Sequence, residues 1–254
     1  MDENTTFMEY RKKVGDSIGI AVRGEAAEDG KFTMSYYYPY FEGHGITSQD
    51  YIEIEKHADQ SSYAGICDEI RLGVTMVFYL QNVAEYYQFL EKTQGMQTIR
   101  SVTISALAKS GSVVLPIAKS ENDILRERQT NTNRNSLIAA ARDGDEDAIE
   151  NLTLEDIDTY TQISRRIRFE DILTIVESSF MPYGIDSDNY YVLGEILEVK
   201  KVENAISGEY VFEMKIRCND MEFDVCINEK DLLGEPAVGR RFRGAVWMQG
   251  IIHF

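Results

Sequence analysis

Five residues within the first quarter of the chain carry side chains suited to proton transfer or metal binding. They are Glu42, His44, Glu53, Glu55 and His57. Carboxylates and imidazoles do this chemistry when several of them converge on one point. Residues two apart on a strand, such as the last three, are separated by roughly 6.5 to 7 Å at Cα, so a loop must supply the remaining groups.

The pattern therefore indicates His44, His57, Glu53 and Glu55 as candidate catalytic residues. No metal or other cofactor is predicted, and His44, His57 and Glu55 are the candidate ligands if a metal is bound. The alternative is a solvated sheet face with alternating charge.

A second group of candidates lies in the C-terminal stretch GRRFRGAVWMQG. If residues 240–254 form a strand, Arg241, Arg243, Trp247 and Gln249 alternate with apolar residues and share one face. Tryptophan and arginine are enriched at the energetic centres of binding interfaces. The stretch therefore predicts a surface for a protein or small-molecule partner, or else an ordinary interface within this protein.

Charge restricts the class of partner. The chain has a net charge of −17, from 43 acidic and 26 basic residues, and residues 181–254 carry 13 acidic against 8 basic side chains. Such a field repels phosphate backbones and anionic membranes. Nucleic-acid binding is therefore the least favoured hypothesis, and no membrane association is expected.

The cellular compartment is expected to be the cytoplasm. The N-terminus is polar and lacks the apolar run that is typical of a secretory signal, and no stretch approaches the ~20 apolar residues of a membrane span. The three cysteines are widely spaced and form no CxxC pair, which is typical of a reducing compartment. The phosphate-binding, dinucleotide, hydrolase and zinc-protease signatures are all missing.

The candidates in the first group depend on an N-terminal α+β unit, residues 1–120. In KFTMSYYYPYF, Phe32, Met34, Tyr36, Tyr38 and Tyr40 recur at every second position, which predicts a strand with one core-facing side, paired with an apolar strand at residues 18–22. YIEIEKH predicts a third strand. Residues 73–92 have the period of a long buried helix, and SVTISALA and SVVLPIA predict a hairpin joined by KSG.

Two further parts are expected after residue 120. Residues 121–184 have the pattern of a helical connector, in which Asp145 is an expected N-cap, Gly144 ends the preceding helix, and Thr153 with Asp156 forms an approximate capping box. Residues 185–254 return to a period of two, with a tight turn at Asn219 and Asp220. They predict a small β-barrel of the OB or SH3-like kind.

Four stretches together resemble a known family. They are YYYPYFEGHGITSQD, YAGICDEIRLGVTMVFYLQN, NLTLEDIDTYTQISRRI and DLLGEPAVGRRFRGAVWMQG. They are similar to the uncharacterised bacterial family named domain of unknown function 3881, along almost the whole chain. The resemblance implies a cytoplasmic bacterial protein, and it transfers no activity and no catalytic residue.

The leading functional hypothesis is a non-enzymatic adaptor or regulatory protein that binds a protein or small-molecule partner. The binding surface would be the Arg and Trp face of the barrel or the groove between domains. The alternative is an enzyme, with or without a metal, that uses the His and Glu cluster. A third hypothesis is nucleic-acid binding through the barrel. The pattern leaves the oligomeric state open.

Overall fold

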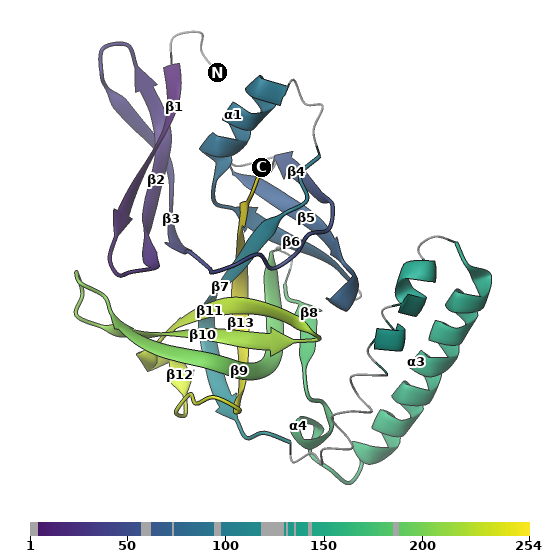
Figure 1. Cartoon of the computed structure of the whole chain (residues 1–254). Helices are drawn as coiled ribbons and strands as arrows, with labels where there is room; N and C mark the ends of the chain where they lie inside the picture. The colour runs from purple at the N-terminus through teal and green to yellow at the C-terminus, as the bar shows by residue number, and fades with distance from the viewer. Residues whose placement is uncertain are drawn as a thin grey trace.

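The protein is described by a computed structural model, in which strands dominate (Figure 1). The structure describes residues 5–56, 62–72, 74–93, 98–117, 130, 132–134, 136–141, 144–184 and 188–254. The strands form a small three-stranded sheet and a larger sheet, part of which closes into a barrel. No helix in these ranges is both long and apolar enough to cross a membrane.

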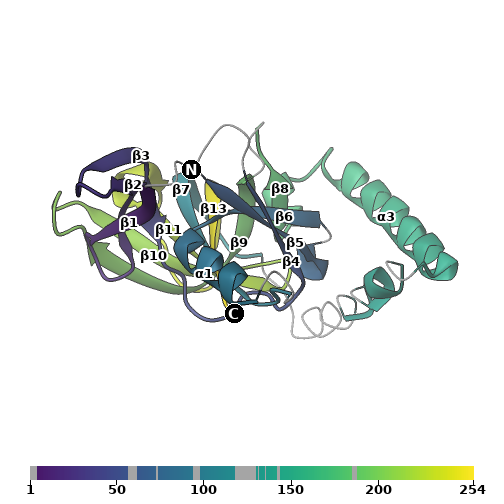
Figure 2. The ribbon, with the colours of Figure 1, turned by 90° about the horizontal axis from the view of Figure 1, so that it is seen from above.

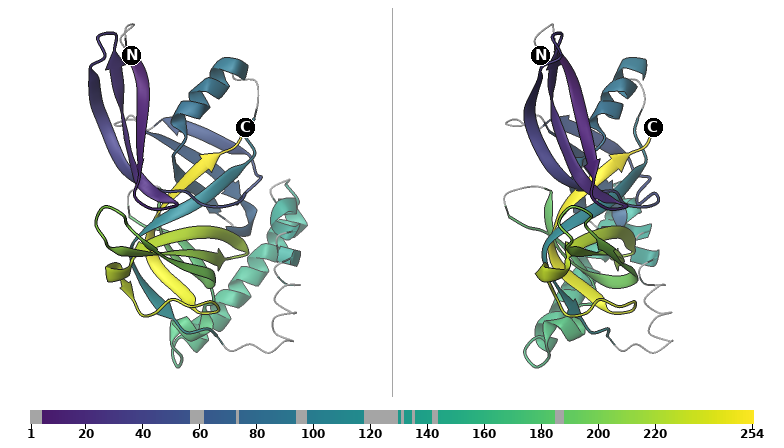
Figure 3. Two further views of the ribbon diagram at one scale, coloured as in Figure 1. Left: turned by 60° about the vertical axis from the view of Figure 1, so that its left-hand side comes forward. Right: turned by 90° about the vertical axis from the view of Figure 1, so that its left-hand side faces the viewer.

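The small sheet is antiparallel and has the order β1-β2-β3. Its strands are β1 (Thr5–Lys13), β2 (Ile18–Ala27) and β3 (Phe32–Phe41). The predicted pairing of the second and third of these strands is confirmed. Figure 3 shows that the β1–β2 turn of this sheet lies beside the barrel.

The expected core face of β3 is confirmed for only part of its length. Tyr38 and Tyr40 are buried, whereas Met34 is 57% exposed. The pairing of β2 with β3 shifts at this point, because Arg23 lies opposite Tyr36 and Gly24 opposite Met34, which leaves Ser35 as an extra residue. A β-bulge of this kind changes which side chains face the core.

The large sheet has the order β12-β7-β11-β10-β9-β13-β6-β5-β4. Strands β7 and β13 also pair with each other, so β7, β11, β10, β9 and β13 form a closed barrel. The strands are β4 (Ile52–Lys56), β5 (Tyr63–Glu69), β6 (Val74–Leu80), β7 (Val102–Val114), β8 (Ser179–Pro182), β9 (Asn189–Glu203), β10 (Tyr210–Cys218), β11 (Met221–Asn228), β12 (Leu232–Leu233) and β13 (Arg241–Ile252).

The main core fills the barrel and continues beneath β6 and β5. Alternate residues of β10 and β11, such as Met214, Ile216 and Phe223, point into it together with Phe242 and Met248 of β13. The predicted turn between β10 and β11 is confirmed, since Asn219 and Asp220 both have positive φ angles, as a two-residue hairpin of this type requires.

The long buried helix was a wrong prediction. Residues Val74–Leu80 form strand β6, and the helix α1 spans only Val83–Thr93, with Val83 as its fully buried residue. The last residues of β6, Phe78, Tyr79 and Leu80, are buried on both faces of the sheet, which removes the alternation that marks a strand. Short 3-10 turns occur at η1 (Ile70–Leu72) and η2 (Glu229–Asp231).

The expected hairpin at residues 101–118 was also wrong, because β7 is one continuous strand. The three-part division at residues 120 and 184 remains a prediction. In the structure β7, from the first part, pairs with β11, β12 and β13 from the third.

The connector contains the helices α3 (Glu146–Arg166) and α4 (Ile172–Ile175). The Asp145 side chain accepts a hydrogen bond from the Ala148 amide, which confirms the predicted N-cap. The predicted capping box was wrong, because Thr153 lies inside α3 and its hydroxyl donates to the Ile149 carbonyl. Figure 2 shows α3 projecting to one side of the sheets.

Candidate functional site

A groove of about 510 Å³ lies between the small sheet and the outer surface of the barrel. Its walls come from the β1–β2 turn, the adjoining parts of β2 and β3, the β9–β10 turn, and strands β7, β10, β11 and β13. Aliphatic side chains dominate it, among them Val14, Ile18, Leu107, Ile206 and Val211. A pocket of this size and composition is typical of small-molecule sites, which span roughly 300 to 1,000 Å³.

The β9–β10 turn forms one wall because its sequence, NAISG, favours a compact turn. The Asn204 side chain accepts hydrogen bonds from the Ile206 and Ser207 amides, and Gly208 has a φ of 70°. The Ala205 amide donates to the Val14 carbonyl at 2.7 Å, which fixes the turn against the small sheet. Figure 3 shows the tip of this hairpin beside the β1–β2 turn.

Tyr40 and Gly19 fit together at the opposite wall. A Cβ atom on Gly19 would lie 2.4 Å from Cζ of Tyr40 and 2.6 Å from the Lys12 carbonyl oxygen. Glycine therefore allows the tyrosine ring to lie flat on β2. The Arg11 guanidinium stacks over the same ring, 5.1 Å from its centroid.

The one tryptophan of the chain, Trp247, also lines the groove. Its Nε1 donates to Asp188 Oδ2 at 2.7 Å, and Asp188 Oδ1 accepts from the Asn189 side chain at 3.0 Å. Asn189 in turn accepts a hydrogen bond from the Lys109 ammonium at 2.9 Å. A chain of polar contacts therefore connects the indole with a lysine at the same groove.

A buried arginine, Arg23 of β2, joins the small sheet to the large one. Arg23 is 0% exposed, and its guanidinium donates to the Glu9 carboxylate, to the hydroxyls of Tyr38 and Tyr79 at 2.8 Å each, and to the Gln81 carbonyl at 2.7 Å. Burial opposes ionisation of both hydroxyls, so it raises the pKa of Tyr38 and of Tyr79.

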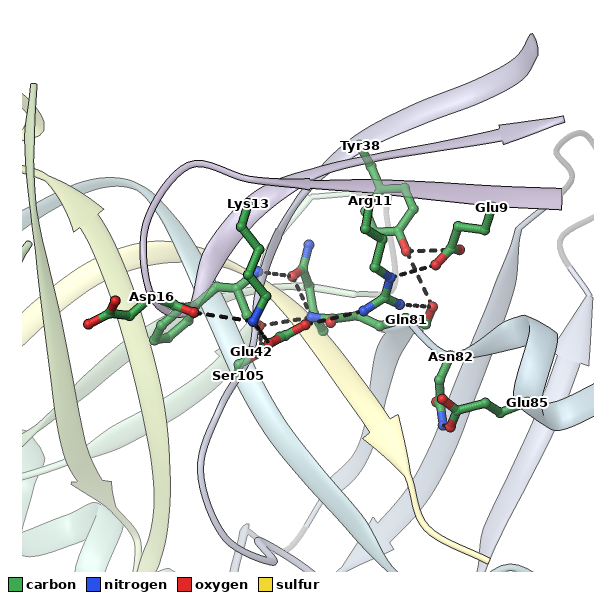
Figure 4. A network of polar contacts seen from close by, with 12 residues as sticks. Glu9, Arg11, Lys13, Asp16, Tyr38, Glu42, Gln81, Asn82, Glu85 and Ser105 are labelled. Carbon is green, nitrogen blue, oxygen red and sulfur yellow. Dashed lines mark hydrogen bonds and ion pairs between the residues drawn. The ribbon is translucent and has the colours of Figure 1, made fainter. Parts of the chain in front are cut away.

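Arg11 extends this junction toward the solvent. Its Nε donates to Glu9 at 2.6 Å and its Nη2 to the Gln81 carbonyl at 2.9 Å, contacts that Figure 4 shows from close by. The side-chain amide of Gln81 donates to the Phe41 carbonyl and to Gln249 Oε1. These contacts hold the end of β3 against β6 and β13.

The four residues of the predicted Arg and Trp face lie in different surroundings in the fold. Gln249 is fully buried and donates to the Pro39 carbonyl, and Arg241 is buried as well. The Arg241 guanidinium donates to the carbonyls of Leu115, Val176 and Leu173 at 2.6 to 3.0 Å, so it anchors the chain around α4.

Arg243 is exposed on β13 and Trp247 is half-buried. Of the four residues of the predicted face, Trp247 is the one that lines the groove.

The structure does not bring the predicted His and Glu cluster together in the ranges that it describes. Glu53 and Glu55 are exposed on β4, and Glu42 contacts Arg11 and Lys13 at 3.4 and 3.3 Å. His57 lies outside the described residues. Within those residues no group of three or more His, Cys, Asp or Glu side chains has the arrangement of a metal site.

His44 instead lies against a carboxylate that the sequence reasoning missed. Its amide donates to Asp224 Oδ2 at 2.6 Å, its ring Nδ1 lies 3.3 Å from the same oxygen, and Lys215 approaches Oδ1 at 3.3 Å. Gly43 permits this close approach, because a Cβ there would lie 2.9 Å from the Ile104 carbonyl oxygen. The His44 side chain is 68% exposed.

Glu213 is a second missed acidic residue near His44. It is 8% exposed, and its Oε1 has no hydrogen-bond partner among the described residues. Burial raises the pKa of Glu213, and the nearby charges of Lys200 and His44 oppose this rise. Glu213 and Asp224 could not be predicted as neighbours of His44, because they lie about 170 to 180 residues away from it in the sequence.

The three cysteines are free and buried. Burial raises the pKa of Cys67 to about 11 and the pKa values of Cys218 and Cys226 to about 12. Thiols with such pKa values stay protonated at neutral pH, which makes them poor nucleophiles. These cysteines therefore act as small packing residues.

A family described as "Domain of unknown function, E. rectale Gene description (DUF3881)" matches residues 1–250. Neither a curated protein nor a solved structure was found to match. The family match confirms the resemblance in the four sequence stretches. The chain therefore belongs to the family of domain of unknown function 3881.

Proposed function

We propose that this protein is a non-enzymatic binding protein, with an adaptor or regulatory role, and that it holds a small, largely apolar ligand in the groove beside Trp247. The observation that carries the proposal is the groove itself, with a volume of about 510 Å³ and aliphatic walls. Burial of apolar ligand surface there would supply about 25 cal/mol per Å² before the cost of association.

The position of the groove supports a regulatory role. Its walls belong to two sheets, and residues of both, such as Ile20 of β2 and Ile206 of the β9–β10 turn, would contact one ligand. A ligand that contacts both sheets stabilises their present arrangement by its binding free energy. A protein partner that recognises this arrangement would therefore respond to the ligand.

Two finer parts of the proposal concern barrel type and compartment. The closed five-stranded barrel supports an OB or SH3-like type. The three free, buried cysteines support residence in a reducing cytoplasm.

The test uses Trp247 as a reporter and 1-decanol as a neutral alkyl probe. The probe should change the emission of Trp247, which lies in the groove wall. Ile206→Asp places a charge at the groove, and we expect it to weaken decanol binding about tenfold or more, since each 1.4 kcal/mol is a factor of ten. Val238→Asp is the control, because Val238 is 66% exposed, Ile206 is 67% exposed, and Val238 does not line the groove.

Saturable binding that Ile206→Asp reduces and Val238→Asp leaves unchanged would support the proposal. Emission that does not respond to decanol, or an equal loss of binding in both variants, would contradict it.

An enzymatic role is the second candidate, and the His44 and Asp224 contact now favours a different place for it. A carboxylate that orients an imidazole is a common arrangement in acid–base catalysis. His44→Gln would abolish such an activity while leaving decanol binding unchanged. If a reaction is found and His44→Gln retains its full rate, this candidate is wrong.

A further inference from the structure

Lys109 occupies an irregular position on β7 beside the groove. In the pairing of β7 with β13, Ala245 lies opposite Ser110 and Val246 opposite Ala108, which leaves Lys109 as an extra residue. A β-bulge of this kind redirects a side chain and is frequent next to functional sites. Here the bulged residue is one of those that line the groove.

The ammonium group of Lys109 is held in place by an uncharged group. It is exposed and donates to Asn189 Oδ1 at 2.9 Å, and within the described residues it forms no ion pair with a carboxylate. Asn189 is kept in position by Asp188, which also accepts the hydrogen bond of Trp247. In a chain with 43 acidic residues, a positioned lysine of this kind indicates an anionic group supplied from outside.

The rest of the groove fits a flexible aliphatic body. Val14, Ile18, Leu107 and Val211 provide branched apolar surface, and Ile206 lies at the hairpin turn. These side chains offer no hydrogen-bonding groups, and the lining residues Asn204 and Asn228 already form hydrogen bonds within the protein, so an anionic group of a ligand needs another partner in the lining. Lys109 provides a positive charge for that group.

We infer that the groove binds an alkyl carboxylate, with the aliphatic chain between the small sheet and the barrel and the carboxylate paired with Lys109. This inference rests on the proposed function, since it concerns the same groove. It adds the chemical class of the ligand and the residue that selects it.

The test compares decanoate with 1-decanol, which has the same chain length and no charge. Binding is measured from Trp247 emission at submicellar concentrations and low ionic strength, where exposed charges are least screened. The variants are Lys109→Gln and Lys56→Gln. Both remove one positive charge, but Lys56 lies on β4 and does not line the groove.

We expect the wild type to bind decanoate about fivefold more tightly than decanol, the value of one exposed ion pair near 1 kcal/mol. Lys109→Gln should lower the ratio of decanoate to decanol affinity to about one, and Lys56→Gln should keep the wild-type ratio. Added salt should reduce the preference in the wild type.

Two results would overturn the inference in different ways. If decanol and decanoate bind equally to the wild type, or if Lys109→Gln keeps the preference, the carboxylate inference is wrong and the groove proposal stands. If neither probe changes Trp247 emission, the proposed function and this inference are both wrong.

Discussion

The contribution of an arginine to stability depends on its surroundings, which differ strongly between Arg23 and Arg217. Arg23 is fully buried and is surrounded by Glu9, two tyrosine hydroxyls and backbone carbonyls. Arg217 pairs with Glu222 at 2.7 Å with both side chains 44% exposed. Solvent weakens the second interaction, whereas the first has no water to replace a lost partner.

Arg23→Met should therefore lower the free energy of unfolding by about 3–5 kcal/mol. Glu9 would keep only its ion pair with Arg11, and the buried Tyr79 hydroxyl and Gln81 carbonyl would lose a hydrogen-bond donor. Arg217→Met should change it by about 1 kcal/mol or less. Urea denaturation of the two variants checks both values. Equal losses would show that Arg23 does not hold the two sheets together.

The raised pKa of Glu213 should make the stability of the protein depend on pH. Its folded pKa is raised above the ordinary value of 4.5, mainly because burial opposes the charge. The folded protein therefore binds this proton more tightly than the unfolded chain does. The stabilising contribution is present below the unfolded pKa and is lost as the pH rises through the folded pKa.

Glu213→Gln removes this ionisation while keeping the shape of the side chain. The free energy of unfolding of the variant minus that of the wild type should increase over the pH range above the ordinary pKa of 4.5. Urea denaturation across this range measures the difference, and Glu222→Gln, at an exposed site, is the control. A difference that stays constant with pH would contradict the shift.

At the scale of elements, the sequence predicted those helices and strands whose form depends on residues close together in the chain. The hairpins β2–β3 and β10–β11 and the N-cap Asp145 follow from alternation, turn residues and capping. Strand β7 escaped prediction because KSG has the composition of a turn. In the fold, the missing side chain of Gly111 makes room for Phe242, since a Cβ there would lie 2.4 Å from its ring.

The hydrogen bonds of Arg241 attach the chain around α4 to the barrel. Its guanidinium donates to three carbonyls at Leu115, Leu173 and Val176. Arg241→Met would leave these carbonyls without their donor, at a cost of about 1–3 kcal/mol for each one that stays buried. Limited proteolysis should then cleave residues 168–178 faster than in the wild type.

Arg243→Met is the matched control, because Arg243 lies two residues away on the same strand and is exposed. It should leave the cleavage rate unchanged. Faster cleavage in both variants, or in neither, would show that Arg241 does not anchor this segment.

At the scale of the whole molecule, the groove could not be predicted from sequence. It combines side chains from segments far apart, such as Ile18, Leu107, Ile206 and Trp247, and these meet only when the small sheet packs on the barrel. The sequence did predict Trp247 as a candidate, and this residue lines the groove. The bulge at Lys109 and the burial of Arg241 and Gln249 both result from strand pairing between distant parts of the chain.

The central claim is that the groove holds a small ligand, and native mass spectrometry tests it most directly. The wild type and Ile206→Asp are purified from the native host under non-denaturing conditions. We predict a discrete added mass of a small organic molecule on the wild type and a clearly reduced fraction of that species on the variant. A wild-type chain without any added mass, or equal occupancy in both proteins, would contradict the claim.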